Sequence, residues 1–147
     1  MMNYFRVVLI ALAFIAVLAG CEKASQKEVT VEVPLGIKAL WVTNIAESGS
    51  ARVGKKTFVQ SDPMVVNIEL VGSGSTNIDV TLFYMNDGKK VANQKSQLEL
   101  PKKNDVVFTF KPEPTWNIGR YLLEFKLNEK VMSHQEIEVV AQGKSAP

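Results

Sequence analysis

Few residues of this chain are of the types that carry acid–base, nucleophilic or metal chemistry. Its 147 residues include one histidine and one cysteine, too few for a histidine-rich metal site, an internal disulfide or the usual serine–histidine–aspartate triad. Ser133 precedes His134, but alternation along a strand would place the two side chains on opposite faces. We therefore expect His134 to be an exposed surface residue, and we expect no catalytic residue.

The carboxylates are spread along the chain rather than clustered. Glu136 and Glu138, two residues apart, would share one face of a strand. Such a pair could begin a cation or glycosidase site, but it is more typical of a solvated strand face. The aspartates lack the spaced order of a calcium loop, and no glycine-rich phosphate loop precedes a helix. The sequence predicts neither a metal nor a bound cofactor.

The charge pattern argues against a nucleic-acid partner. Seventeen basic residues nearly balance fifteen acidic ones. The basic residues come as separated pairs, at 55–56, 89–90 and 102–103, and not as a concentrated stripe. We expect no DNA or RNA binding.

Cys21 is the one reactive side chain whose neighbouring sequence indicates a function. Arg6 and the free amine precede a wholly apolar run at 7–18, after which Ala19 and Gly20 lead into the cysteine. This is the order of a signal peptide. A twelve-residue helix would be about 18 Å long, short of the roughly 30 Å hydrocarbon core, so a permanent membrane span is the weaker interpretation.

Residues 18–21, Leu-Ala-Gly-Cys, resemble the lipobox of bacterial prolipoproteins. The resemblance implies that a signal peptide, residues 1–20, is removed, and that Cys21 receives diacylglycerol and an N-acyl chain that anchor the protein in a membrane. Glu22, where an aspartate would favour inner-membrane retention, implies the periplasmic face of the outer membrane in a two-membrane bacterium. The alternative is an ordinary signal peptide, which would leave Cys21 a free thiol.

Period-two patterning organises the rest of the chain. Residues 21–27 form a polar tether after the lipidated cysteine, 28–142 the folded domain and 143–147 a flexible tail. Apolar and polar residues alternate in short segments between turn-forming residues, with no helical stripe. This predicts an all-β, antiparallel two-sheet sandwich of seven or eight strands. We expect strands at 28–33 and 36–45 (halves of one edge strand), 57–60, 64–71, 77–85, 91–100 (an edge), 106–110, 121–127 and 131–140.

A second resemblance lies within residues 116–125, WNIGRYLLEF. Trp116, Gly119 and Tyr121 match the Trp-x-x-Gly-x-Tyr stretch of bacterial immunoglobulin-like and fibronectin-like domains. The resemblance implies an immunoglobulin-like sandwich in which the glycine allows a corner and the tyrosine hydroxyl bonds back to nearby backbone. The role of these residues would be structural. The inter-sheet cysteines and central-strand tryptophan of antibody domains are absent.

The outward-facing residues give the one prediction of a binding surface. If Leu82 and Leu123 face the core, then Phe83, Met85 and Leu122 face outward on strands that are neighbours in the immunoglobulin-like order. Together they would form an apolar patch of the kind that marks an interface. The alternative is that they are isolated exposed apolar residues, which are common.

The predicted function is that of a lipid-anchored, non-enzymatic module that binds a protein partner in the envelope through a sheet face or a free edge strand, or that is purely structural. The alternative is a carbohydrate-binding or hydrolytic domain that uses the loops at one end of the sandwich. There, Trp41 or Trp116 would be a stacking platform. For Trp41, packing under the sandwich is the more ordinary role.

Overall fold

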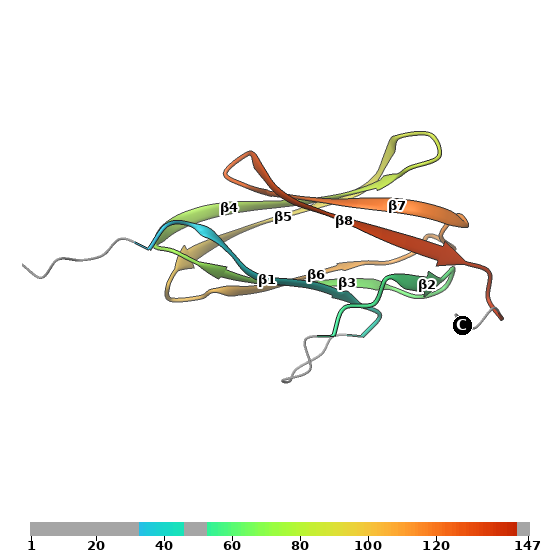
Figure 1. The fold of residues 1–147 in the computed structure, drawn as a ribbon, viewed down its shortest axis with the longest axis horizontal. Helices are drawn as coiled ribbons and strands as arrows, with labels where there is room; N and C mark the ends of the chain where they lie inside the picture. Colours follow the sequence, from blue (N-terminus) through green and yellow to red (C-terminus); the bar gives the residue numbers. More distant parts are fainter. Residues whose placement is uncertain (1–32, 46–52, 144–147) are drawn as a thin grey trace, which may run out of the picture. The chain divides into compact units, whose positions relative to one another are not determined.

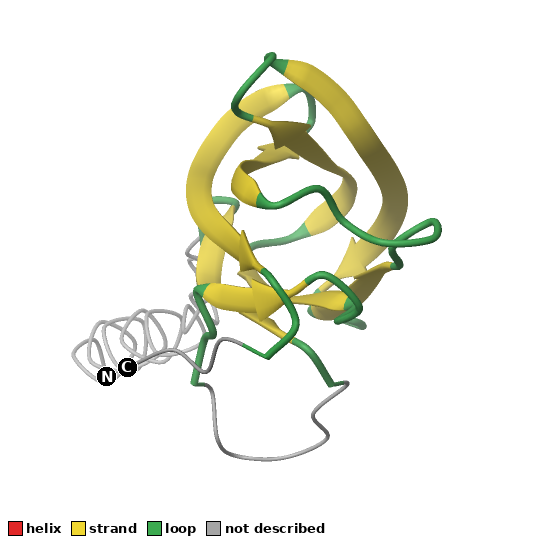
Figure 2. Ribbon diagram, turned by 90° about the vertical axis from the view of Figure 1, so that its right-hand side faces the viewer, coloured by secondary structure: helices red, strands yellow, loops and turns green. Residues whose placement is uncertain are grey.

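The computed structural model describes residues 33–45 and 53–143, which belong to one compact unit. The predicted signal peptide, Cys21, the tether and nearly all of the first predicted half-strand lie outside the described residues. The described residues contain strands joined by turns and loops (Figure 2). None of them forms a helix that could cross a membrane. The strands are β1 Gly36–Thr43, β2 Thr57–Val59, β3 Met64–Val71, β4 Gly74–Tyr84, β5 Lys89–Leu100, β6 Asp105–Phe110, β7 Gly119–Leu127 and β8 Lys130–Val140.

The eight strands form two sheets that face each other (Figure 1). One sheet has the order β1-β3-β6 and the other the order β2-β8-β7-β4-β5. The predicted all-β, two-sheet architecture is confirmed, and β1 and β5 are edge strands as expected. All pairings are antiparallel except that of β2 with β8. After β1 the chain crosses to the other sheet and adds β2 alongside the end of β8, running in the same direction.

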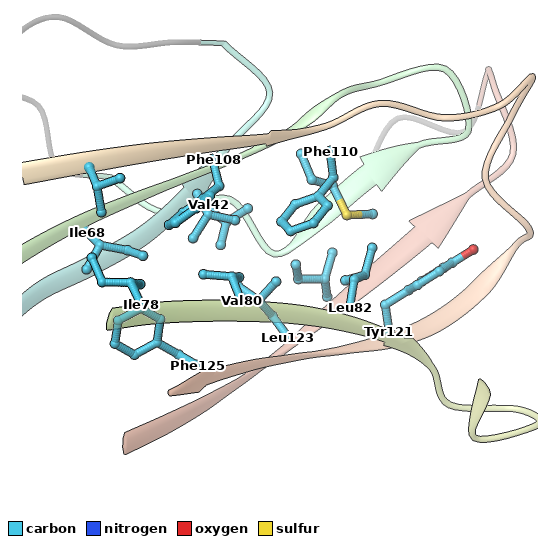
Figure 3. Packing of buried hydrophobic residues seen from close by; sticks show 14 of the residues in the cluster. Val42, Ile68, Ile78, Val80, Leu82, Phe108, Phe110, Tyr121, Leu123 and Phe125 are labelled. Atoms are coloured by element: carbon cyan, nitrogen blue, oxygen red, sulfur yellow. The ribbon is translucent and has the colours of Figure 1, made fainter. Parts of the chain in front are cut away.

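The core lies between the two sheets and is made of the residues that alternation predicts to face inward (Figure 3). Burial of each large apolar side chain is worth about 1.5–3 kcal/mol, which makes this layer the main source of stability. The fully buried set runs along both sheets and includes Met64, Val66, Ile68, Leu70, Ile78, Val80, Leu82, Phe110, Tyr121, Leu123, Phe125, Leu127, Ile137 and Val139.

The turn between β3 and β4 is shorter than the sequence suggests. The expected strands at 64–71 and 77–85 leave the glycine- and serine-rich stretch 72–75 between them, but β4 already begins at Gly74. Gly72, with a φ of 131°, makes the reversal. A Cβ atom there would lie 2.9 Å from the Cα of Leu35, so the position needs glycine because the incoming chain passes close to it.

The two ends of the sandwich differ. The described chain enters at β1, whose Gly36 pairs with Val71 beside the start of β4. That end also has the turns β3–β4, β5–β6 and β7–β8. The opposite end has the longer connections, including the loop between β1 and β2 and residues 111–118. Residues at the end of β4 therefore lie far from where the chain enters.

Candidate binding face on the five-stranded sheet

The outer face of the five-stranded sheet brings the predicted apolar residues together. Phe83 of β4 and Leu122 of β7 are register partners in adjacent strands. Partners on one face have Cβ atoms about 4.5–5.5 Å apart, so the two side chains are neighbours. Met85 follows β4, and its backbone N–H donates to the carbonyl of Arg120 at 2.9 Å. All three apolar side chains are partly exposed. We call Phe83, Met85 and Leu122 the apolar cluster.

Charges of opposite sign border the apolar cluster on its two sides. Lys90 of β5 is the register partner of Phe83. On the other side, Glu136 of β8 is the partner of Leu122. Glu136 lies 3.5 Å from the guanidinium of Arg120, and both side chains are exposed. At the level of the apolar cluster, β5 therefore contributes a cation and β8 a carboxylate that is paired with Arg120.

A polar network around Asp79 of β4 lies on the same face of the sheet. Its carboxylate accepts hydrogen bonds from Asn93 at 2.5 Å and Thr81 at 3.2 Å, and lies 3.1 Å from the ammonium of Lys95. Burial opposes ionisation of Asp79, but these hydrogen bonds outweigh it and hold the pKa of the carboxyl below its usual value. The sequence did not reveal this network, because its members come from different strands.

His134 pairs with a carboxylate and not with a serine. Its Nε2 lies 3.3 Å from Glu124, which also contacts Lys126 at 2.8 Å. The hydrogen bond from Lys126, together with that from His134, lowers the pKa of Glu124. The predicted exposure of His134 is confirmed. Since His134 pairs with this carboxylate and contacts no nucleophile, it is part of a surface side-chain network.

The corner before β7 is held by hydrogen bonds to backbone carbonyls. The buried Tyr121 hydroxyl donates to the carbonyl of Asn117 at 2.9 Å. Burial raises the pKa of Tyr121, which keeps the hydroxyl protonated as a donor. The indole Nε1 of Trp116 donates to the carbonyl of Asp62 at 2.7 Å. The corner residues therefore tie the β6–β7 connection to both the β2–β3 turn and β7.

A second tyrosine takes part in this corner, and no local pattern in the sequence indicates it. The Tyr84 hydroxyl donates to the carbonyl of Ile118 at 2.8 Å, and its ring centroid lies 5.0 Å from that of Tyr121. Gly119 has a φ of 140°, and a Cβ atom there would lie 3.1 Å from the Tyr84 ring. Glycine suits this position because side chains of L residues rarely adopt this φ and a Cβ atom would press against the Tyr84 ring.

Replacing Tyr121 with phenylalanine should lower the free energy of unfolding by about 1 kcal/mol or more, because the Asn117 carbonyl loses its donor while the ring still fills its site. Equilibrium urea unfolding of the two proteins measures the difference. Tyr84→Phe is the variant for comparison, because it also removes one tyrosine hydroxyl of the corner. That hydroxyl lies nearer the surface and accepts a hydrogen bond from Asn86. Equal stability of Tyr121→Phe and the unchanged protein would contradict the structural role of this hydroxyl.

The two tryptophans have different surroundings. Trp116 is 5% exposed and joined to Asp62, so its ring faces cannot stack on a sugar without opening the corner. Trp41 of β1 lies opposite Asn67 on the outer face of the three-stranded sheet, and is partly buried beside Gly54. The next residue, Val42, lies in the core, and Leu40 on the same side of β1 packs against it.

A groove of about 830 Å³ lies where β5 and β6, the edges of the two sheets, diverge. Amides, hydroxyls and charged groups dominate its lining, which includes Thr115 and Glu113. Gln94 spans the gap, and its Nε2 donates to the Thr109 carbonyl at 2.7 Å. This bond satisfies a carbonyl at the open edge of β6. Together with the polar composition of β5, it protects the edges against added strands.

Within the described residues, no group of three side chains is arranged to hold a metal ion. The acidic pair Glu136 and Glu138 lies exposed on β8, as expected for a solvated strand face. Glu136 is paired with Arg120. The side chains gathered on the sheet face thus form ion pairs and an apolar cluster, an arrangement suited to contact with another surface.

Comparison with solved structures identifies the fold. An immunoglobulin-like protein from Pseudomonas aeruginosa aligns over 75% of this chain and 99% of its own, with a TM-score of 0.53 and 12% identity. The C-terminal domain of Wzt aligns over 74% of each chain, with a TM-score of 0.50 and 13% identity. The alkylpurine DNA glycosylase AlkC from Pseudomonas fluorescens, solved with DNA, aligns over 75% of this chain but 31% of its own, with a TM-score of 0.52 and 13% identity. No family model and no curated protein sequence matches the chain.

The chain therefore contains an immunoglobulin-like β-sandwich. In the strand lettering of immunoglobulin domains, β6 and β7 take the places of strands E and F, and Tyr121 lies at the start of F where a corner tyrosine is found. At these identities the likeness concerns the fold alone. Such a fold fits a binding or structural module.

Proposed function

We propose that this protein is a lipid-anchored module of a bacterial envelope that binds a protein partner through the outer face of its five-stranded sheet. The Leu-Ala-Gly-Cys sequence that ends at Cys21, placed after a signal-like segment, supports the anchor. With Glu22 next, the periplasmic face of the outer membrane is the proposed location in a two-membrane organism. The module has no enzymatic role in this proposal.

The observation that carries the binding face is the direct cross-strand pairing of Phe83 with Leu122, with Met85 next to them. These are large apolar side chains, partly exposed on a face whose other residues are mainly charged or polar. Complete burial of each side chain would contribute up to about 1.5–3 kcal/mol to the binding free energy. The contribution is smaller by the amount that partial burial already supplies in the free protein. The free edges are less suited to the task, because β5 is polar and Gln94 bridges to β6.

The position of the apolar cluster along the strands supports access to a partner. The chain enters at Gly36, beside the start of β4, whereas Phe83 is near the end of that strand. Phe83 lies nine residues after Gly74 in the strand, or about 30 Å at 3.3 Å per residue. A tether of residues 22–27 would hold the first end near the bilayer and leave the cluster in the aqueous compartment.

Crosslinking in the native envelope, followed by capture of this protein, tests the proposal. Leu122→Glu should abolish the crosslinked protein species, because a carboxylate would be desolvated in the centre of the interface. Val107→Glu is the matched control, since Val107 is 51% exposed on the other sheet. It should leave the crosslinks unchanged. Equal crosslinking by a folded Leu122→Glu variant would overturn the binding face.

A further inference from the structure

The face around the apolar cluster has an ordered sequence of side chains across four strands. Register pairs join Lys90 of β5 to Phe83 of β4, Phe83 to Leu122 of β7, and Leu122 to Glu136 of β8. The order across the sheet is therefore cation, ring, aliphatic chain, carboxylate. Lys90 is exposed and forms no ion pair with another described residue.

A twofold rotation can place this row of side chains against complementary side chains of a second copy. A twofold axis parallel to the strands, lying above the sheet between β4 and β7, places β5 of one copy over β8 of the other and β4 over β7. Lys90 then faces Glu136 of the second copy, and Phe83 faces Leu122 of the second copy. Each contact occurs twice, as in any isologous interface. We call the row of Lys90, Phe83, Leu122 and Glu136 the central row. Because the strands of two sheets packed face to face cross at up to about 30°, the match between the copies is closest in this row.

Two further rows satisfy the same operation. Asp79 and Lys126 are register partners on β4 and β7, so the rotation sets Asp79 of each copy over Lys126 of the other. Between this row and the central one, Thr81 would face Glu124 of the other copy, an uncharged side chain against a carboxylate. No like charges face each other directly in these positions. Complementary charge of this kind selects the partner and its register.

We propose that the partner of this face is a second copy of the chain, in a face-to-face twofold dimer. This inference rests on the proposed function of the same face and names its partner. This axis is compatible with anchoring at Cys21. Rotation about an axis parallel to the strands leaves the start of β1 in both copies at the same end of the dimer. Both tethers can then reach one bilayer. Confinement of both copies to a membrane also raises their effective concentration, which favours a modest interface.

Charge reversals in full-length protein carrying two different tags test the dimer. The copies are coexpressed, extracted from the envelope in detergent and captured by one tag, and the second tag is measured. Lys90→Glu in both copies sets carboxylates against Glu136, and Glu136→Lys in both sets ammonium groups against Lys90. Each should reduce co-capture at least about tenfold. Coexpression of Lys90→Glu with Glu136→Lys should restore it, because both contacts become attractive again.

The matched controls are Lys103→Glu and Glu113→Lys, which change the net charge equally at exposed positions away from this face. They should be captured like the unchanged protein. Circular dichroism checks that all variants are folded. The dimer is overturned if folded Lys90→Glu copies still capture each other fully, or if the mixed pair does not recover. If it is overturned while Leu122→Glu still removes a crosslinked protein from the native envelope, the proposed binding function stands with a different partner.

Discussion

Cys21→Ser is expected to abolish membrane anchoring of the protein. A serine hydroxyl cannot form the thioether to diacylglycerol, so the chain should leave the membrane fraction or accumulate as an unprocessed precursor. The effect should be nearly complete, because each buried methylene contributes about 0.8 kcal/mol and several acyl chains are lost together. Fractionation of the envelope and the mass of the mature protein measure the two consequences.

Ala24→Ser provides the control for this change, since it introduces the same side chain in the proposed tether. It should leave both the added fatty mass and the membrane fraction unchanged. A native protein whose Cys21 is a bare thiol would contradict lipidation. The protein would then be better described as a soluble secreted module with an ordinary signal peptide.

The second large effect concerns two phenylalanines on opposite faces of one sheet. Phe125 of β7 is fully buried, and truncation to alanine leaves a cavity in the layer between the sheets. We expect Phe125→Ala to lower the free energy of unfolding by about 3–5 kcal/mol. Because domains of this size are stable by only about 5–15 kcal/mol, a large part of the protein should be unfolded under mild denaturing conditions. Urea unfolding measures this loss.

Phe83→Ala removes the same atoms from the partly exposed outer face of the sheet. We expect it to cost about 1 kcal/mol or less in stability, because the side chain has fewer contacts to lose. It should instead weaken crosslinking and self-capture. If Phe83→Ala destabilised the protein as much as Phe125→Ala while leaving its contacts intact, the outer face would be part of the fold and not a binding surface.

Much of this architecture could be predicted from local patterns. The alternation of Ile78, Val80 and Leu82 identified both the strand and its buried face, since side chains on a strand point alternately to its two sides. The apolar cluster came from the same alternation, combined with an expected neighbour relation between the two strands. The register now makes Phe83 and Leu122 direct partners.

Other features depend on residues distant in the sequence. The parallel pairing of β2 with β8 joins Thr57 to Glu138, and no local pattern encodes it. The pairing of His134 with Glu124 follows from the register of the β7–β8 hairpin, which includes a bulge beyond Phe125. Alternation along residues 77–85 places Tyr84 on the inward side, but only the tertiary structure brings its hydroxyl to the Ile118 carbonyl in the β6–β7 connection.

The sequence by itself determined the approximate positions of the strands, the side of each strand that is buried and three corner residues, Trp116, Gly119 and Tyr121, and it contains the motif that supports the proposed lipid attachment. These follow from interactions between near neighbours in the chain, or from a short recognition motif. The tertiary structure alone decided which strands are adjacent, in what register, and hence that Lys90, Phe83, Leu122 and Glu136 form one row. The physical reason is that pairing between strands is set by the packing of the complete core, which sums contacts from all eight strands.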